Sequence, residues 1–356
     1  MKKRVFGLDL VRVVALILVM LVHSFFYSDF NSQPLNSLQS FILLYFRNIA
    51  FVGVLLFITL TGYLKTNKKL DKNHYKSLIN VLLVYFIVSI ITVIYRNYVL
   101  HTSVPLVLLL IGIFNYTAAP YAWYVEMYIG LFLMIPFLNI LYHNIPTKRQ
   151  KQILILTLFS IISLFPTLSK IVISGYVIDI FPDWWKLFFP ILMYYIGSYL
   201  REYKIHINKL VLLPITILYI YLQTVILYYY AQGNNTYSIP ISENSAFSVI
   251  LACLVFLLLY DLKTHSKINY KIMAFFSETT FAAYLMSYCF DETFYSLIPL
   301  FTPGSKYYFA LCSFITMPII FLCSILSGYI VNLIIKIVTK IIKNIKAKLA
   351  KRTFEA

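Results

Sequence analysis

Residues 6–29 read FGLDLVRVVALILVMLVHSFFYSD, and this stretch decides the fold class. It is apolar enough and long enough to cross a membrane as a helix. Three ionisable residues, Asp9, Arg12 and His23, interrupt it, and at about 100° per residue they project from one side of the helix. Because ionisable groups are costly inside a membrane span, such a stripe favours a functional site. The alternative is that Asp9 and Arg12 mark the boundary of the span and His23 reaches outward to the surface.

The composition extends this reading to the whole chain. Hydrophobic residues make up 61% of the sequence and charged residues 12%, whereas soluble domains average about 45–50% and 25%. The opening MKKR and the apolar run after it resemble a signal peptide superficially. No small-residue cleavage site follows, so we expect a retained first span.

Apolar runs of about 20 residues predict an all-α integral membrane protein with about ten transmembrane helices. With the N-terminus inside, 24 of the 30 lysines and arginines fall in predicted cytoplasmic segments. The positive-inside rule therefore predicts that both termini lie in the cytoplasm. We expect a multi-pass protein of the cell membrane, in a bacterial cytoplasmic membrane. The net charge of +17 then reflects topology and anionic lipid, and no nucleic acid is expected as a partner. The predicted spans are 8–28, 41–64, 77–96, 122–142, 153–173, 187–200, 210–230, 246–260, 274–297 and 307–335.

The last segment differs in character from the spans before it. The tail KIVTKIIKNIKAKLAKR is basic, and its apolar stripe suits a helix lying on the inner leaflet. We therefore divide the chain into a polytopic membrane domain, 1–335, and a basic amphipathic cytoplasmic helix, 336–356. The four cysteines lack the spacing of a zinc site or a disulfide framework, and no metal is expected.

Four predicted spans place ionisable groups at a similar depth, roughly 6–9 Å below the outer surface at 1.5 Å per residue. They are His23, Arg47, Glu126 and Asp291. A histidine can serve as general base at neutral pH, and a carboxylate such as Asp291 or Glu126 can orient it. Arg47 could offset oxyanion charge or bind the donor. The alternative is that all four are interfacial and exposed to water.

The spacing of the stripe on the first span suggests a kind of substrate. Arg12 and His23 lie about 16 Å apart along the helix axis. The helix thus presents a donor-binding group, Asp9 and Arg12, on the inside and a base, His23, near the outside. This arrangement suits a long donor with an anionic head, and acyl-coenzyme A has that form. On the residues alone, a transporter and an enzyme both remain open.

Four stretches in order resemble the membrane acyltransferase-3 family. They are LDLVRVVALILVMLVH, RNIAFVGVLLFITLTGYL, PYAWYVEMYIGLFLMIPFLN and SETTFAAYLMSYCF. The family often has a histidine where this chain has Tyr121 and another where it has Ser287, and it often has more arginines near Lys76 and Asn80. The matched positions are Asp9, Arg12, Ala15, Val19, His23, Thr61, Gly62, Tyr63, Trp123, Tyr124, Gly130, Pro136, Ser277, Phe281, Tyr284 and Leu285.

The resemblance implies ten spans and transfer of an acyl group, commonly acetyl, to a cell-envelope carbohydrate. It implies that His23 is the catalytic histidine and that Arg12 belongs to the donor site. Lys76, one of five lysines in 65–76, is a candidate for holding the coenzyme phosphates. Trp123 and Tyr124 are candidates for binding the acceptor.

We therefore expect a membrane O-acyltransferase that takes an acyl group, acetyl before others, from acyl-coenzyme A as co-substrate, with no permanently bound cofactor. The acceptor is a hydroxyl of a surface polysaccharide, a teichoic-type polymer or a lipid-linked glycan, with His23 as general base. Direct transfer and a covalent relay both remain open. The alternatives are a polysaccharide exporter or flippase, and a sensory or scaffold subunit that has lost the chemistry.

Overall fold

The computed structural model describes residues 4–352, apart from 29, 103–104, 172–179, 232, 240 and 302–305. All regular secondary structure in these described residues is helical. The end of the fifth predicted span, 172–173, and residues 353–356 of the tail lie outside them. The α-helices are α1 (Phe6–Tyr27), α2 (Leu38–Ala50), α3 (Gly53–Lys65), α4 (Lys72–Lys76), α5 (Leu78–Tyr98), α6 (Leu106–Phe114), α7 (Trp123–Asn144), α8 (Lys148–Phe159), α9 (Phe165–Ile171), α10 (Phe189–Tyr203), α11 (Lys209–Ala231), α12 (Ala246–Leu259), α13 (Lys267–Phe301) and α14 (Lys306–Arg352). The 3₁₀-helices are η1 (Phe30–Ser32), η2 (Pro120–Ala122), η4 (Asp183–Phe188) and η5 (Thr236–Ser238), and a π-helical turn, η3 (Ser160–Leu164), joins α8 to α9.

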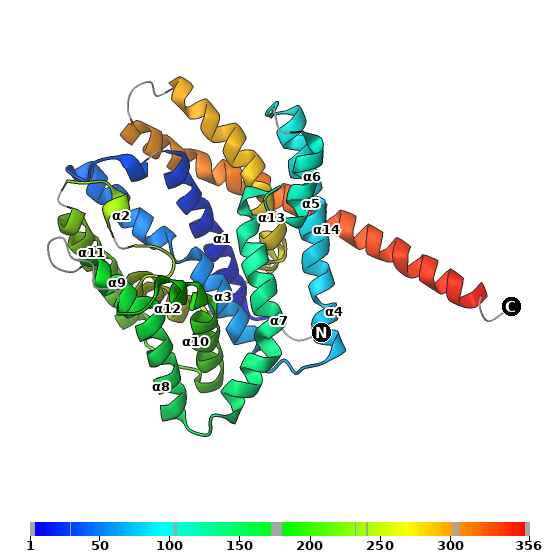
Figure 1. Ribbon diagram of the computed structural model, residues 1–356, viewed down its shortest axis with the longest axis horizontal. Helices are drawn as coiled ribbons and strands as arrows, with labels where there is room; N and C mark the ends of the chain where they lie inside the picture. Colours follow the sequence, from blue (N-terminus) through cyan, green and yellow to red (C-terminus); the bar gives the residue numbers. More distant parts are fainter. Residues whose placement is uncertain are drawn as a thin grey trace.

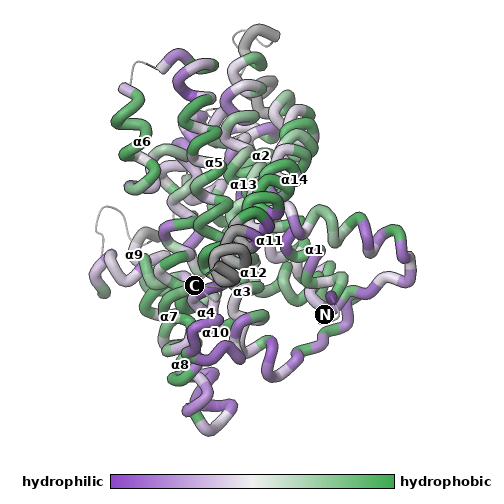
Figure 2. The backbone as a smooth tube through the Cα atoms, turned by 90° about the vertical axis from the view of Figure 1, so that its right-hand side faces the viewer, coloured by the Kyte–Doolittle hydropathy of each residue, from purple (hydrophilic) through white to green (hydrophobic). Residues whose placement is uncertain are grey.

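The chain is a multi-pass membrane protein. Within the described residues, 7 helical segments are long and apolar enough to cross a membrane, and Figure 2 shows hydrophobic residues along the helices and hydrophilic ones at several connections. The other three predicted spans fall on α10, α12 and α13. The first two have only 15 and 14 residues, and serine, threonine and acidic residues interrupt α13. The count of ten and the cytoplasmic termini stay predictions.

The first helix lies in the interior of the bundle, where it packs against α3 and α13 (Figure 1). Val11, Ala15, Leu16 and Met20 on α1 are fully buried. Lipid tails are as apolar as leucine, so close packing rather than hydrophobicity holds such helices together. The polar stripe of α1 is therefore enclosed by protein instead of lipid.

The second predicted span is two helices, α2 and α3, with a break at Phe51 and Val52. Gly53 begins α3 directly against α1. A Cβ there would lie 2.8 Å from Val19 Cγ2 and 2.9 Å from the Ala15 carbonyl oxygen, so only glycine permits this approach. The break sets Phe51 beside the C-terminal half of α1.

The last helix combines the tenth predicted span with the basic tail. α14 runs from Lys306 to Arg352, and its C-terminal part projects from the body of the protein (Figure 1). Ile337 and Ile341, on the expected apolar stripe, are exposed. An exposed apolar stripe on a basic helix is typical of contact with a lipid surface.

Candidate functional site

A histidine, an aspartate and a tyrosine meet at the C-terminal end of α1. Asp291, fully buried on α13, places its Oδ2 3.4 Å from Nδ1 of His23. Tyr121, from η2, donates its hydroxyl hydrogen to the same Oδ2 at 2.6 Å. The rings of His23 and Tyr121 are stacked, with centroids 3.8 Å apart. An acid at Nδ1 favours the tautomer that leaves Nε2 free to accept a proton.

A second tyrosine fixes this arrangement. Tyr284, on α13, donates its hydroxyl hydrogen to the Tyr121 carbonyl oxygen at 2.6 Å. This bond ties the backbone of η2 to α13, the helix that carries Asp291, and so holds the base of the Tyr121 side chain at a fixed place beside that carboxylate. Tyr121 is one of the positions where the sequence departs from the family that it resembles, and in the structure its hydroxyl contacts the carboxylate that faces His23.

The opposite end of α1 carries a network of cations around one carboxylate. Asp9 accepts hydrogen bonds from Arg4, at 3.0 Å from Nε and 2.9 Å from Nη2. It also accepts from Ser277 Oγ at 2.6 Å and from Arg12 Nη1 at 3.2 Å. Arg4 makes a further ion pair with Glu278, which is largely exposed. Desolvation opposes it, but the Asp9 carboxylate raises the pKa of Arg4 above its ordinary value, so this cation is permanent.

Next to this network lies a cavity of about 450 Å³, called here the basic cavity. Four cations line it, Arg4, Arg12, Lys68 and Arg201, and Asp9 is the acid among its lining residues. Excess positive charge with several donors suits a multiply charged anion such as a phosphate group. The sequence pointed to Arg12 and to the 65–76 lysines, but it gave no sign of Arg4 or Arg201.

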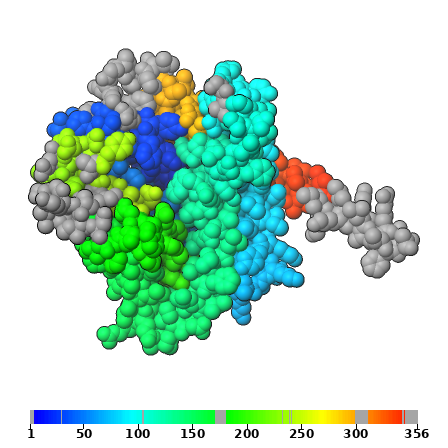
Figure 3. Space-filling view, in the orientation of Figure 1, coloured from blue at the N-terminus to red at the C-terminus, as the bar shows by residue number. Residues whose placement is uncertain are grey.

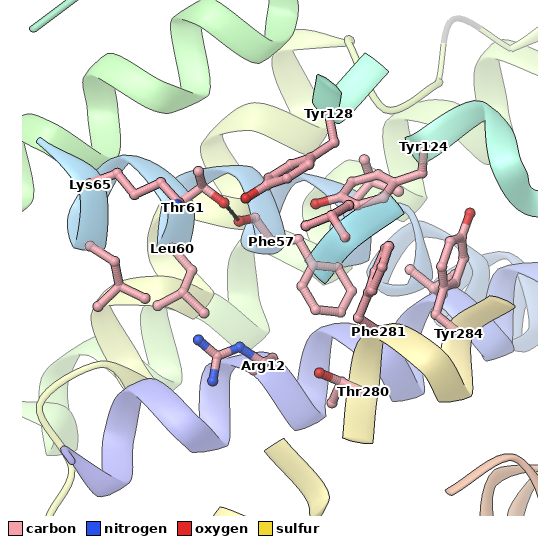
Figure 4. Close-up of a pocket in the computed structure, with 14 residues that line it drawn as sticks. Arg12, Phe57, Leu60, Thr61, Lys65, Tyr124, Tyr128, Thr280, Phe281 and Tyr284 are labelled. Atoms are coloured by element: carbon pink, nitrogen blue, oxygen red, sulfur yellow. Dashed lines mark hydrogen bonds between the residues drawn. The ribbon is translucent and has the colours of Figure 1, made fainter. Parts of the chain in front are cut away.

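A second cavity of about 260 Å³, the central cavity, continues from Arg12 along α1 (Figure 4). Arg12 reaches it from α1, and Tyr124 and Tyr128 face it from α7 on the other side. Its remaining lining is largely apolar side chains from α3 and α13, with Lys65 at the edge. It shares Arg12 and Leu64 with the basic cavity. Such a cavity suits an uncharged chain with a few polar groups.

The third cavity, about 210 Å³, is called here the histidine cavity. His23, Trp123, Phe51 and Glu243 line it, and it shares Val19, Val54 and Tyr284 with the central cavity. In Figure 3 part of α1, in dark blue, is visible between α7, in teal, and the yellow-green segments. Three adjacent cavities thus follow α1 from its cations to its histidine.

The structure brings only some of the predicted site residues together. His23 and Asp291 are in contact, Asp9 and Arg12 share the basic cavity, and Trp123 and Tyr124 line the histidine and central cavities. Glu126 is exposed on α7, Lys76 is exposed on α4, and neither lines any of the three cavities. Their assignment to the site therefore finds no support in the geometry.

Arg47 is buried, as expected, but apart from the three cavities. Its Nε donates to Asn31 Oδ1 at 2.7 Å, and its guanidinium carbon lies 4.6 Å from the centroid of the Phe51 ring. The Thr236 hydroxyl also donates to Asn31 Oδ1, at 2.8 Å. Arg47 thus ties α2 to η1 through Asn31, which in turn bonds η5, and it packs on Phe51, a wall of the histidine cavity.

The family model described as an acyltransferase domain matches residues 5–337, nearly the whole chain. No curated protein matches the sequence. No solved structure matches it either. Among the described residues, no group of three or more His, Cys, Asp or Glu could hold a metal ion.

Proposed function

The chain belongs to the acyltransferase-3 family and is an acyltransferase, and we propose that it moves an acetyl group from acetyl-coenzyme A to a hydroxyl of a cell-envelope polysaccharide or lipid-linked glycan. The observation that carries this proposal is the row of three cavities along α1. It begins at four cations and ends at a buried histidine–aspartate pair.

Each part of the donor has a cavity of matching chemistry. The phosphates of coenzyme A fit the basic cavity, where Arg4, Arg12 and Arg201 offer guanidinium forks and Lys68 a point charge. The uncharged pantetheine arm fits the central cavity. Arg12 and His23 are separated by about 16 Å of helix, so the thioester then lies toward His23.

His23 acts as general base in the proposed reaction. Nε2 removes the proton from the acceptor hydroxyl while that oxygen attacks the thioester carbonyl carbon. The carbon–sulfur bond then breaks, and the proton passes to the departing thiolate, giving an acetyl ester and free coenzyme A. Asp291 orients the imidazole and stabilises its charged form. Tyr121, by donating to Asp291, keeps that carboxylate aimed at Nδ1.

Acetyl transfer by the purified protein tests the proposal. The protein is placed in lipid nanodiscs with labelled acetyl-coenzyme A and envelope glycan from cells that lack it. We expect label in the glycan with wild-type protein and transfer slower by about 10²–10⁴ with His23→Ala. His265→Ala, which removes an exposed histidine that lines none of the three cavities, is the matched control and should transfer normally.

The same experiment separates an enzyme from an exporter. Wild-type protein that leaves acetyl-coenzyme A intact but moves glycan across a vesicle membrane would contradict the proposal. It would instead support the exporter function.

A further inference from the structure

The connection between α11 and α12 carries a carboxylate to the histidine cavity. Its described residues include Glu243, which lines that cavity together with His23 and Trp123. Glu243 is 220 residues away from His23 in the chain, so this meeting is a product of the fold, and nothing in the sequence pattern points to it.

Both ends of this connection are fixed to other parts of the protein. The Thr236 hydroxyl donates to Asn31 Oδ1, and the Leu35 amide donates to the Asn234 carbonyl oxygen at 3.0 Å. At the other end the Ala246 amide donates to Thr167 Oγ1 at 2.9 Å. These bonds place Glu243 at the histidine cavity and limit its movement.

The Glu243 carboxylate has no hydrogen-bond partner among the described residues. Its neighbours bond with each other instead, since Ser242 Oγ donates to Asn244 Oδ1 at 2.6 Å and Ser248 Oγ donates to the Ser242 carbonyl oxygen at 2.7 Å. A half-buried carboxylate can only accept hydrogen bonds when ionised. It therefore offers free acceptor oxygens to whatever enters the cavity.

The charge around this cavity selects against anions. Its ionisable lining groups are His23, Glu243 and the Tyr284 phenol, and no lysine or arginine lines it. Asp291 stands behind His23, and the Arg47 guanidinium is separated from the cavity by the Phe51 ring. Trp123, which is 40% exposed, contributes an aromatic surface. An aromatic face with one carboxylate acceptor suits a sugar ring, whose apolar face stacks and whose hydroxyls donate. The Glu243 carboxylate would repel a carboxylate or phosphate on that sugar, and this repulsion disfavours the binding of anionic sugars.

We infer that Glu243 and Trp123 form the acceptor subsite and select an uncharged sugar, with Glu243 accepting a hydrogen bond from a hydroxyl beside the one that is acylated. The inference rests on the proposed function and narrows its substrate class. Teichoic-type acceptors, which carry phosphate, are excluded where that phosphate adjoins the acylated hydroxyl.

A matched pair of glycan pools tests this selection. Envelope glycan from cells lacking the protein is divided, and one half has its primary hydroxyls oxidised to carboxylates. Wild-type protein should acetylate the neutral pool at least about 10-fold faster, and Glu243→Gln should reduce this preference to about threefold or less, because the repelling charge is lost while hydrogen bonding is partly kept. Trp123→Ala should raise the KM for both pools alike, with the KM for acetyl-coenzyme A unchanged.

Asp183→Asn provides the control for charge. It removes an equivalent carboxylate that is largely exposed in η4 and lines none of the three cavities, and it should keep the wild-type preference. Equal rates of wild-type protein on both pools, or an unchanged preference in Glu243→Gln, would overturn the inference while leaving acetyl transfer established.

A binding measurement keeps the inference separate from the proposed function. Glu243→Cys, with the four native cysteines replaced, is labelled with a charged thiol reagent in the presence of each pool. Protection by the neutral pool alone, without acetyl transfer by the parent protein, would support the subsite and contradict the proposed function. Equal protection, or no protection, by both pools would contradict the subsite.

Discussion

The two ends of α1 hold ionisable groups in opposite ways. At the N-terminal end Asp9 is surrounded by donors from Arg4, Arg12 and Ser277, so its charge is fully compensated. At the C-terminal end His23 faces Asp291 at 3.4 Å, and His23 Nδ1 and Asp291 Oδ1 lack a hydrogen-bond partner. The first arrangement holds fixed charges, as binding requires. In the second arrangement the contact between His23 and Asp291 can shorten when His23 takes up a proton, as catalysis requires.

Replacing the base should produce the largest effect. His23→Ala should lower kcat for acetyl transfer by about 10²–10⁴ because proton transfer from the acceptor is lost. The KM for acetyl-coenzyme A should stay near the wild-type value, since the donor phosphates bind at the other end of α1. Steady-state kinetics in nanodiscs measure both. A normal kcat would show that His23 is a buried structural residue.

Removing the carboxylate's charge should have the next largest effect. Asp291→Asn keeps the shape and can still accept the Tyr121 hydrogen, but it no longer stabilises charged imidazole. We expect kcat to fall by about 10²-fold, with a shift in the pH profile of kcat that a purely structural change would not produce. If Asp291→Asn lowered protein yield while kcat and its pH profile stayed unchanged, Asp291 would have no orienting role.

The sequence revealed the stripe on α1 and missed most of what surrounds it. Helical spacing aligns Asp9, Arg12 and His23 because it depends on one helix alone. The position of each residue along its predicted span places Asp291 and Arg47 at the same depth below the outer membrane surface. This depth does not show which helices are neighbours. Only packing sets Asp291 against His23 and Arg47 against Asn31.

The basic cavity was hidden for a different reason. Arg201 and Arg4 stand at span ends, where lysine and arginine are common in any membrane protein, so each resembles a topology signal. The α2–α3 break was also missed, because its sequence is uniformly apolar. The sequence shows Tyr121 only as a departure from the family, because its contact with Asp291 depends on a 3₁₀ turn that no periodicity predicts.

Substitutions at the donor-binding end of α1 should weaken the binding of acetyl-coenzyme A and leave kcat almost unchanged. Arg12→Ala should raise the KM for acetyl-coenzyme A by about 10-fold, and Arg12→Lys should recover only part of the loss, because lysine lacks the bidentate fork of arginine. The kcat should change little in either variant. Complete recovery in Arg12→Lys would show that charge alone matters, and an unchanged KM in Arg12→Ala would remove Arg12 from the donor site.

The smallest expected effect is a difference in the KM for acetyl-coenzyme A between variants of two lysines in the segment 65–76. Lys68 lines the basic cavity, whereas Lys76 is exposed outside it. Lys68→Ala should raise the KM for acetyl-coenzyme A about threefold, the loss of one exposed point charge, at roughly 0.6 kcal/mol. Lys76→Ala should leave it unchanged. The reverse order would favour the phosphate role that the sequence suggested for Lys76.

We propose further that the donor's head and the acceptor reach α1 from opposite sides of the membrane, because the basic cavity and the histidine cavity lie at opposite ends of that helix. Single cysteines at 68, in the basic cavity, and at 123, in the histidine cavity, test this in a protein without its native cysteines. In sealed vesicles of known orientation, an impermeant thiol reagent should label position 68 from one side and position 123 from the other. Acetyl-coenzyme A should protect position 68 when it is added on that side. Labelling of both positions from the same side would contradict the approach of donor and acceptor from opposite sides.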